Sequence, residues 1–158
     1  MTETDERPDS GRAATCAALM IEIAPLVLRA MRKELAAHEG VELSVPQFRA
    51  LRFVGRRPGD SLSDLAEHLG TSRPAASKLA DRLAEVGLLT RATDPGDRRQ
   101  ALLSLTDRGR GALQAAHDAA EARLAERLAQ LAPDDLELCA QALGTLRDLF
   151  AAGSQRDR

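Results

Sequence analysis

Residues 61–106 read SLSDLAEHLGTSRPAASKLADRLAEVGLLTRATDPGDRRQALLSLT. The stretch begins with two short segments of helical periodicity and ends with two extended segments joined by a turn rich in proline, glycine and charge. This order predicts a helix-turn-helix followed by a β-hairpin wing. The main physical use of that arrangement is to place one helix and one loop in two grooves of DNA.

The first predicted helix covers residues 62–69. Ser61 is a good N-cap, and Asp64, three residues later, completes a capping box that satisfies the first backbone amides. The apolar residues fall on one face at helical spacing: Leu62, Leu65, Ala66 and Leu69. Gly70 follows directly, as is typical of a helix that ends in a left-handed residue.

The second predicted helix has Thr71 as its expected cap and Pro74 in its first turn, where a missing amide costs little, and it is stopped by Gly87. Its inner face is apolar and carries Ala76, Leu79, Ala80, Leu83 and Val86. Its outer face is mostly polar and carries Ser72, Arg73, Pro74, Ser77, Lys78 and Asp81.

This outer face has the side chains of a recognition helix, which presents its N-terminal end to base edges. Arg73 is expected to read a guanine through two hydrogen bonds. Ser72 and Ser77 are expected to contact bases or phosphates. Lys78 is better placed to bind a phosphate, which positions the helix without specifying a sequence. The alternative is an ordinary surface helix whose polar side chains are solvated.

The predicted wing has strands at residues 88–93 and 100–105, joined by the turn sequence DPGD at residues 94–97. In the second strand, Leu103 and Leu105 share one face, with Ser104 opposite. Arg91, on the first strand, is a further candidate for a DNA contact.

Two arginines, Arg98 and Arg99, lie near the tip of the predicted wing. Arginine is favoured in narrow A·T-rich minor grooves, where the negative potential is enhanced. Asp97 could hold the side chain of Arg99 in place, and Asp81 on the recognition helix is a second possible partner. The alternative is a solvated charged turn with an incidental ion pair.

The motifs TSRPAASKLADRLAEVGLL and DPGDRRQALLSLTDRG, with SVPQFRALRFV before them, resemble the MarR (multiple antibiotic resistance regulator) family of winged-helix transcription factors. The resemblance covers residues 13–152. It implies a homodimeric transcriptional regulator, most often a repressor, that binds double-stranded DNA. By the same resemblance, residues 71–78 would read the major groove, Arg99 would enter the minor groove, and Asp97 would brace it.

The resemblance also implies a small-molecule effector, because members of this family commonly bind small aromatic or phenolic anions between their dimer and DNA-binding regions. By position, Arg29, Arg49 and Arg52 are candidates to meet such an anion. Phe48 and Phe53 are candidates to line the cleft. Solvated charges and core phenylalanines explain these five residues equally well.

The segments outside the winged helix are helical, with apolar periodicity over residues 13–38, 106–132 and 133–152. We therefore expect a mainly α (α+β) fold with long terminal helices and a two-stranded β wing. The expected parts are a winged helix-turn-helix DNA-binding region at 44–105, a helical dimerisation region at 13–43 and 106–152, and polar, disordered ends at 1–12 and 153–158.

The apolar stripes of the terminal helices have no other core to cover them within one subunit. A two-fold dimer with interleaved terminal helices would bury the stripes. Such a dimer would present two recognition helices to the half-sites of a pseudo-palindromic operator, roughly 10 bp apart. The alternative is a monomer whose terminal helices fold back on themselves.

The overall charge balance is not that of a general DNA-binding protein, because the formal net charge is −2. Residues 61–100 contain six Lys or Arg and six Asp or Glu, so DNA binding would depend on local placement of the cations and weaken steeply with salt. The acidic balance leaves a second function open, that of a winged-helix protein-interaction module without DNA specificity.

The two cysteines, Cys16 and Cys139, lie on apolar faces and are expected to behave as small hydrophobic residues. Both belong to the dimerisation region, so a cysteine-based redox-responsive regulator is the alternative. The three histidines are scattered, with no His/Cys pair at ligand spacing, so no metal or other cofactor is expected. No phosphate-binding loop or nucleophile motif is present, so an enzyme is not expected.

The N-terminal segment carries acidic residues instead of the basic start of a signal peptide. The apolar run at residues 13–31 contains Glu22 and Pro25, which argue against a membrane span. We therefore expect a cytoplasmic protein.

Overall fold

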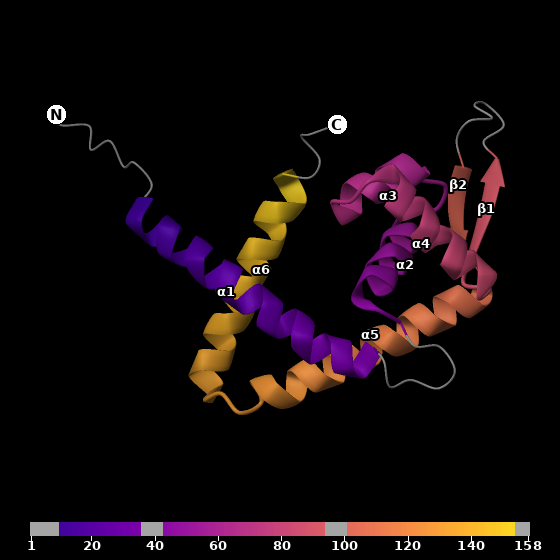
Figure 1. The fold of residues 1–158 in the computed structure, drawn as a ribbon. Helices are drawn as coiled ribbons and strands as arrows, with labels where there is room; N and C mark the ends of the chain where they lie inside the picture. The colour runs from indigo at the N-terminus through magenta and orange to yellow at the C-terminus, as the bar shows by residue number, and fades with distance from the viewer. Residues whose placement is uncertain (1–9, 36–42, 94–100, 154–158) are drawn as a thin grey trace. The chain divides into compact units, whose positions relative to one another are not determined.

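The computed structural model describes residues 10–35, 43–93 and 101–153 (Figure 1). Within these residues the chain forms six helices and a two-stranded sheet: α1 (Ser10–Leu35), α2 (Val45–Arg56), α3 (Leu62–Leu69), α4 (Arg73–Glu85), β1 (Leu89–Thr93), β2 (Ala101–Leu105), α5 (Asp107–Leu128) and α6 (Pro133–Gly153). The predicted fold class, a mainly α winged helix with a two-stranded wing, is confirmed. The chain divides after Glu121 into two compact units, of which the first contains the winged helix.

Capping residues define the starts of α2 and α3. The Ser44 hydroxyl accepts a hydrogen bond from the Gln47 amide, and the Gln47 side chain returns one to the Ser44 amide. Ser61 and Asp64 form the same capping box at α3, as predicted. Gly70 then ends α3 with φ of +66°, which is the left-handed conformation expected of it.

The cap of α4 differs from the prediction. The hydroxyl that accepts from the Ala75 amide belongs to Ser72, at 3.4 Å, and not to Thr71. The amide of Thr71 instead donates to the Ala66 carbonyl at 3.0 Å, so this residue completes the C-terminal turn of α3. The turn between α3 and α4 therefore includes Thr71, and α4 begins one residue later than a Thr71 cap would place it.

The wing is an antiparallel hairpin in which Leu89 pairs with Leu105 and Thr93 pairs with Ala101. β1 begins one residue later than predicted, and Gln100, the predicted start of the second strand, lies outside the described residues. The segment before α3 also joins β2 on its other edge, because Ser61 forms a bridge with Leu102 and the Leu103 amide donates to the Asp60 carbonyl. The base of the wing is thus held from two sides.

The core of the first unit lies where α2, α3, α4 and the wing meet. Its largest fully buried side chains are Leu35, Leu51, Leu65, Leu83, Leu88, Leu103 and Val54. In α4 the predicted inner face is buried at Ala76, Ala80 and Leu83, but Val86 is 45% exposed. Val86 caps the C-terminal end of α4, so its side chain lies beyond the last turn that faces the core.

The start of α5 is bound tightly to the end of α4, at what we call the α4–α5 junction (Gly87, Leu88, Thr106, Arg108 and Gly109). The Thr106 hydroxyl accepts from the Gly109 amide at 2.9 Å and donates to the Gly87 carbonyl at 2.7 Å. The Thr106 amide donates to the Leu88 carbonyl, and the Arg108 guanidinium donates to the Val86 carbonyl. Thr106 is therefore the cap of α5, as predicted, and also joins the two helices.

The terminal helices differ slightly from their predicted bounds. α1 starts at Ser10, so residues 10–12 are helical and not disordered, and α6 includes Gly153. α5 ends at Leu128, four residues before the predicted end. Segments 1–9 and 154–158 lie outside the described residues.

Several large apolar side chains of α1 are exposed: Leu19, Ile21, Ile23, Leu26 and Leu28. Between Ser10 and Arg32 this helix is long and apolar enough to cross a membrane, despite Glu22 and Pro25. That criterion rests on length and composition alone, and helices of soluble proteins also meet it. Leu19, Ile23 and Leu26 share one side of α1 by helical spacing, and this exposed apolar face needs a partner.

Candidate nucleic-acid interface

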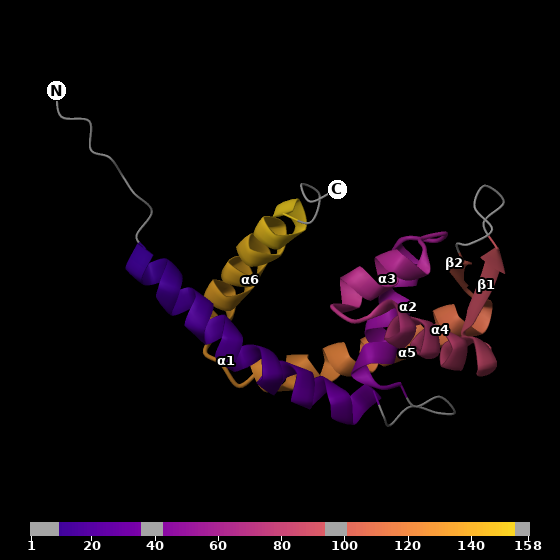
Figure 2. The ribbon, with the colours of Figure 1, turned by 45° about the horizontal axis from the view of Figure 1, so that its top comes forward.

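The outer face of α4 is open to solvent over its first two turns. Ser72, Arg73, Pro74 and Lys78 are exposed, and Ser77 is half-buried. Two views of the structure show that α4 lies beside the wing (Figures 1 and 2), and its last turn leads directly into β1. The structure thus presents the predicted recognition residues next to the predicted wing.

A groove of about 280 Å³ lies where α3, α4 and the base of the wing meet. Its lining residues are Leu62, Arg73, Pro74, Ser77, Arg91 and Ala101. Four of the predicted DNA-binding residues therefore share one concave surface, although they come from two separate elements.

Arg91 forms an ion pair with Asp81 across the contact between β1 and α4. The Ser77 hydroxyl also reaches Asp81, with 3.5 Å between the two oxygens. Asp81 is thus the partner of Arg91. Arg99, for which Asp81 was also a candidate partner, lies outside the described residues. Because a carboxylate offsets its charge, Arg91 is better suited to fixing the wing against α4 than to binding phosphate on its own.

The charges of Arg73 and Lys78 are not offset in this way. Within residues 10–35, 43–93 and 101–153, neither side chain forms a hydrogen bond or ion pair. Arg73 is the first residue of α4, where the positive end of the helix adds to its own charge. This end of the helix favours an anionic partner. Asp97, Arg98 and Arg99 lie outside the described residues.

The two phenylalanines that are candidates to line a ligand cleft are buried in the core of the first unit. Phe48 is 3% exposed and Phe53 is 6% exposed. The Phe53 ring stacks on the His68 imidazole, with 4.6 Å between ring centroids, so the side chain joins α2 to the last turn of α3. The alternative stated for Phe48 and Phe53, that they pack α2 into the core, agrees with their burial.

The charges of four arginines of the α2 region act on this stacked histidine: Arg49, Arg52, Arg56 and Arg57. The Arg49 guanidinium donates to the His68 carbonyl at 3.1 Å. Burial, and then the charges of these arginines, lower the pKa of His68 from its usual 6.5. The Arg52 pKa is also lowered, by burial and then by Arg56. We call this the His68 arginine cluster.

The spacing of Arg49, Arg52 and Arg56 along α2 could have shown from sequence that they share a face, but not that His68 lies among them. The remaining predicted ligand residue, Arg29, is exposed on α1. In the single chain, Cys16 is exposed and Cys139 is half-buried.

His68 gives the first prediction, a pH dependence of stability. Its folded-state pKa is lowered, so the folded chain favours the neutral imidazole. This contribution to the free energy of unfolding is present above about pH 6.5 and is lost as the pH falls through the lowered value. His68→Phe keeps an aromatic ring stacked on Phe53. We expect its free energy of unfolding to fall less between pH 7 and pH 5 than that of the wild type. Urea denaturation across that range tests this, and equal slopes for both proteins would contradict it.

Comparisons with known proteins agree on one family. A model of the MarR family matches residues 41–100. The HTH-type transcriptional repressor Rv2887 of Mycobacterium tuberculosis is 31% identical over 96 residues, which cover 59% of this chain and 69% of that protein. The HTH-type regulator YfiV of Bacillus subtilis is 26% identical over 67% of this chain and 66% of its own length.

Solved structures show the same fold. Rv1404 of Mycobacterium tuberculosis superposes with a TM-score of 0.75 and 22% identity over 96% of this chain and 97% of that one. FabT of Streptococcus pneumoniae, solved in complex with DNA, gives a TM-score of 0.68 at 16% identity and covers 89% and 98%. Rv2887 in complex with p-aminosalicylic acid gives 0.67 at 23% identity and covers 82% and 96%. The chain belongs to the MarR family of transcriptional regulators.

Proposed function

We propose that the protein is a homodimeric repressor that binds double-stranded DNA in a sequence-specific manner and is released by a small anionic ligand. The observation that carries this proposal is the exposed start of α4, where Arg73 and Lys78 stand without a partner among the described residues beside the base of the wing. The DNA complex of FabT, which shares this fold, supports it.

In this proposal α4 enters the major groove and the wing reaches an adjacent minor groove. Arg73 reads a base, and Ser72 and Ser77 contact bases or phosphates. Lys78 binds a phosphate. The Ser72 hydroxyl already accepts from the Ala75 amide, so its hydrogen is available to a phosphate oxygen. Arg98 and Arg99 supply the wing contact.

The second copy of the chain would cover the apolar faces of the terminal helices. The exposed side chains on α6 are Leu136, Leu138, Leu143, Leu149 and Phe150. The apolar faces of α1 and of α6 are each open to solvent in the single chain, and exposed apolar patches of this kind mark interaction surfaces in soluble proteins. A two-fold dimer would bury them and would place two α4 helices on a pseudo-palindromic site.

The second prediction tests this dimer. Leu143→Asp places a charge in the apolar stripe of α6, where burial without a partner is costly. We expect the variant to elute as a monomer at concentrations at which the wild type is a dimer, measured by size exclusion with light scattering. Gln141→Asp, on another face of the same helix, is the matched control and should remain dimeric. A monomeric wild type, or a dimeric Leu143→Asp protein, would contradict the dimer.

The His68 arginine cluster supports the ligand part of the proposal. Four guanidinium groups attract an anion, and after burial their positive charges are the second cause that lowers the pKa of His68. Arg49 and Arg52 of this cluster, with Arg29, are the proposed contacts to an aromatic or phenolic carboxylate. The p-aminosalicylic acid complex of Rv2887 indicates the class of probe. If p-aminosalicylic acid leaves DNA affinity unchanged, this effector assignment is wrong but DNA binding stands.

The test of the function is fluorescence anisotropy on duplexes tiled from the DNA upstream of the protein's own gene, with excess competitor DNA. A tight site with two-fold symmetry and strong salt dependence is expected. Binding that varies with salt but not with sequence would indicate an operator elsewhere. No binding at any salt concentration would overturn the proposal and favour a protein-interaction module.

A further inference from the structure

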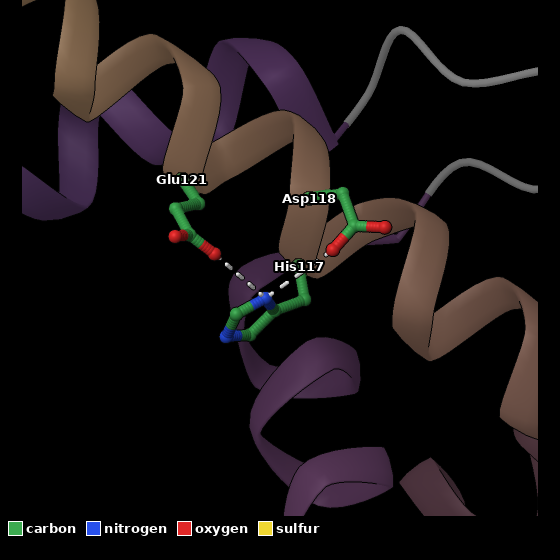
Figure 3. A group of neighbouring side chains, drawn as sticks. All are labelled: His117, Asp118 and Glu121. Atoms are coloured by element: carbon green, nitrogen blue, oxygen red, sulfur yellow. Dashed lines mark ion pairs between the residues drawn. The ribbon is translucent and has the colours of Figure 1, made fainter.

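Three side chains with metal-binding atoms lie together on α5, outside the candidate DNA interface (Figure 3). His117 Nδ1 is 3.5 Å from Glu121 Oε2 and 3.7 Å from Asp118 Oδ1. The three ligand atoms all lie within 4.8 Å of one another. Glu121 follows His117 by one helical turn, so the helix itself places the imidazole and this carboxylate on one face.

These separations are close to those that a tetrahedral metal ion imposes. With metal–nitrogen and metal–oxygen distances of about 2.0–2.2 Å, two ligand atoms lie about 3.4 Å apart. The separations of 3.5 and 3.7 Å from His117 Nδ1 need to shorten by only a few tenths of an ångström, and the two carboxylate oxygens, which lie within 4.8 Å of each other, must also approach. All three side chains are exposed, so small changes in their rotamers can supply that movement.

The chemistry of the donors selects a class of ion. Two carboxylates balance the charge of a divalent cation, and an imidazole ligand suits zinc and its neighbours in the first transition row better than magnesium or calcium. The Gln114 side chain donates to Asp118 Oδ1 at 2.8 Å, which orients that carboxylate from outside the cluster. Water would complete the coordination on the open side.

We propose that His117, Asp118 and Glu121 form a surface site for a divalent transition-metal ion of the zinc class. The His117 Nδ1 atom and one oxygen of each carboxylate are the ligands. The spacing of histidines and cysteines in the sequence does not indicate this site, because its second and third ligands are carboxylates. The competing explanation is an ion pair between a protonated His117 and the two acids, which involves no metal.

The two explanations differ in what happens to a proton. Zinc binds the neutral imidazole through Nδ1, so binding to the protonated ring releases one proton and weakens as the pH falls. Calorimetric titration of the full chain with Zn²⁺ in two buffers of different ionisation enthalpy measures that release. A ¹H–¹⁵N spectrum localises the binding, and we expect Zn²⁺ to shift the amides around residues 114–122.

The test compares the wild type with His117→Ala and Glu121→Gln, each of which should weaken the localised Zn²⁺ binding at least tenfold. Glu126→Gln removes the same charge from an exposed acid on the same helix and should leave it unchanged. All three positions are exposed, and circular dichroism checks that the variants fold. Absence of Zn²⁺ binding at α5 up to about 1 mM, or equal binding by all four proteins, would overturn the proposal.

Discussion

Gly109→Ala is expected to unfold the protein under conditions in which the wild-type chain is stable. A Cβ atom at this position would overlap the carbonyl oxygen of Leu88 and lie 2.9 Å from its carbonyl carbon. Both atoms belong to the backbone, and the Leu88 oxygen also accepts the Thr106 amide. The Leu88 backbone and the first turn of α5 cannot move apart without breaking the hydrogen bonds of the α4–α5 junction. We expect a loss of more than about 4 kcal/mol, a large part of the stability of a small domain.

The matched control is two residues away on the same helix. A Cβ at Gly111 would meet nothing within 4 Å, so Gly111→Ala should stabilise α5 by about 0.5–1 kcal/mol through helix propensity. Urea denaturation followed by circular dichroism measures both variants. If Gly109→Ala and Gly111→Ala both keep the urea midpoint of the wild type, the close approach of Gly109 to the Leu88 backbone is contradicted.

Arg73→Ala is expected to lower affinity for the specific operator by about ten- to a hundredfold and to relax the preference for one base pair. Arg73 is exposed at the first position of α4 and lines the groove beside the wing. Lys78→Ala should act differently, because a phosphate contact carries no sequence information. It should weaken binding to all duplexes alike and reduce the salt slope by about one.

Arg82→Ala is the control for this second prediction. It removes the same charge from the same helix, but nine residues after Arg73, in the last turn and on the side opposite Arg73. Anisotropy on a series of single-base operator variants separates the three results. Arg73→Ala with an unchanged affinity and base preference would mean that another element reads the sequence.

The parts of the fold that sequence predicted well are those with local causes. The capping box at Ser61 and the left-handed Gly70 depend on residues three or four positions apart, and both are present. Thr71 and Ser72 were harder to separate, because both are good caps. The choice was decided by the hydrogen bond of Thr71 back to Ala66, which depends on how α3 ends.

The parts that sequence did not predict depend on contacts between distant residues. No signal within a single element indicates that Arg91 of β1 pairs with Asp81 of α4, or that the arginines of α2 act on His68 of α3. The close approach of Gly109 to Leu88 is of the same kind, since it exists only once β1 and α5 have met. The candidate recognition face was predictable because it lies on one short helix, whereas the arginine cluster required the packing of two.

The α4–α5 junction has a consequence for how a signal could reach DNA. Hydrogen bonds from Thr106 and Arg108 join the backbone at the end of α4 to the first turn of α5, and Gly109 leaves no gap between them. We therefore expect the end of α4 and the first turn of α5 to move together as one rigid unit. A ligand or partner that tilts the start of α5 by a few degrees re-aims Arg73 at the far end of α4, without touching the recognition helix itself.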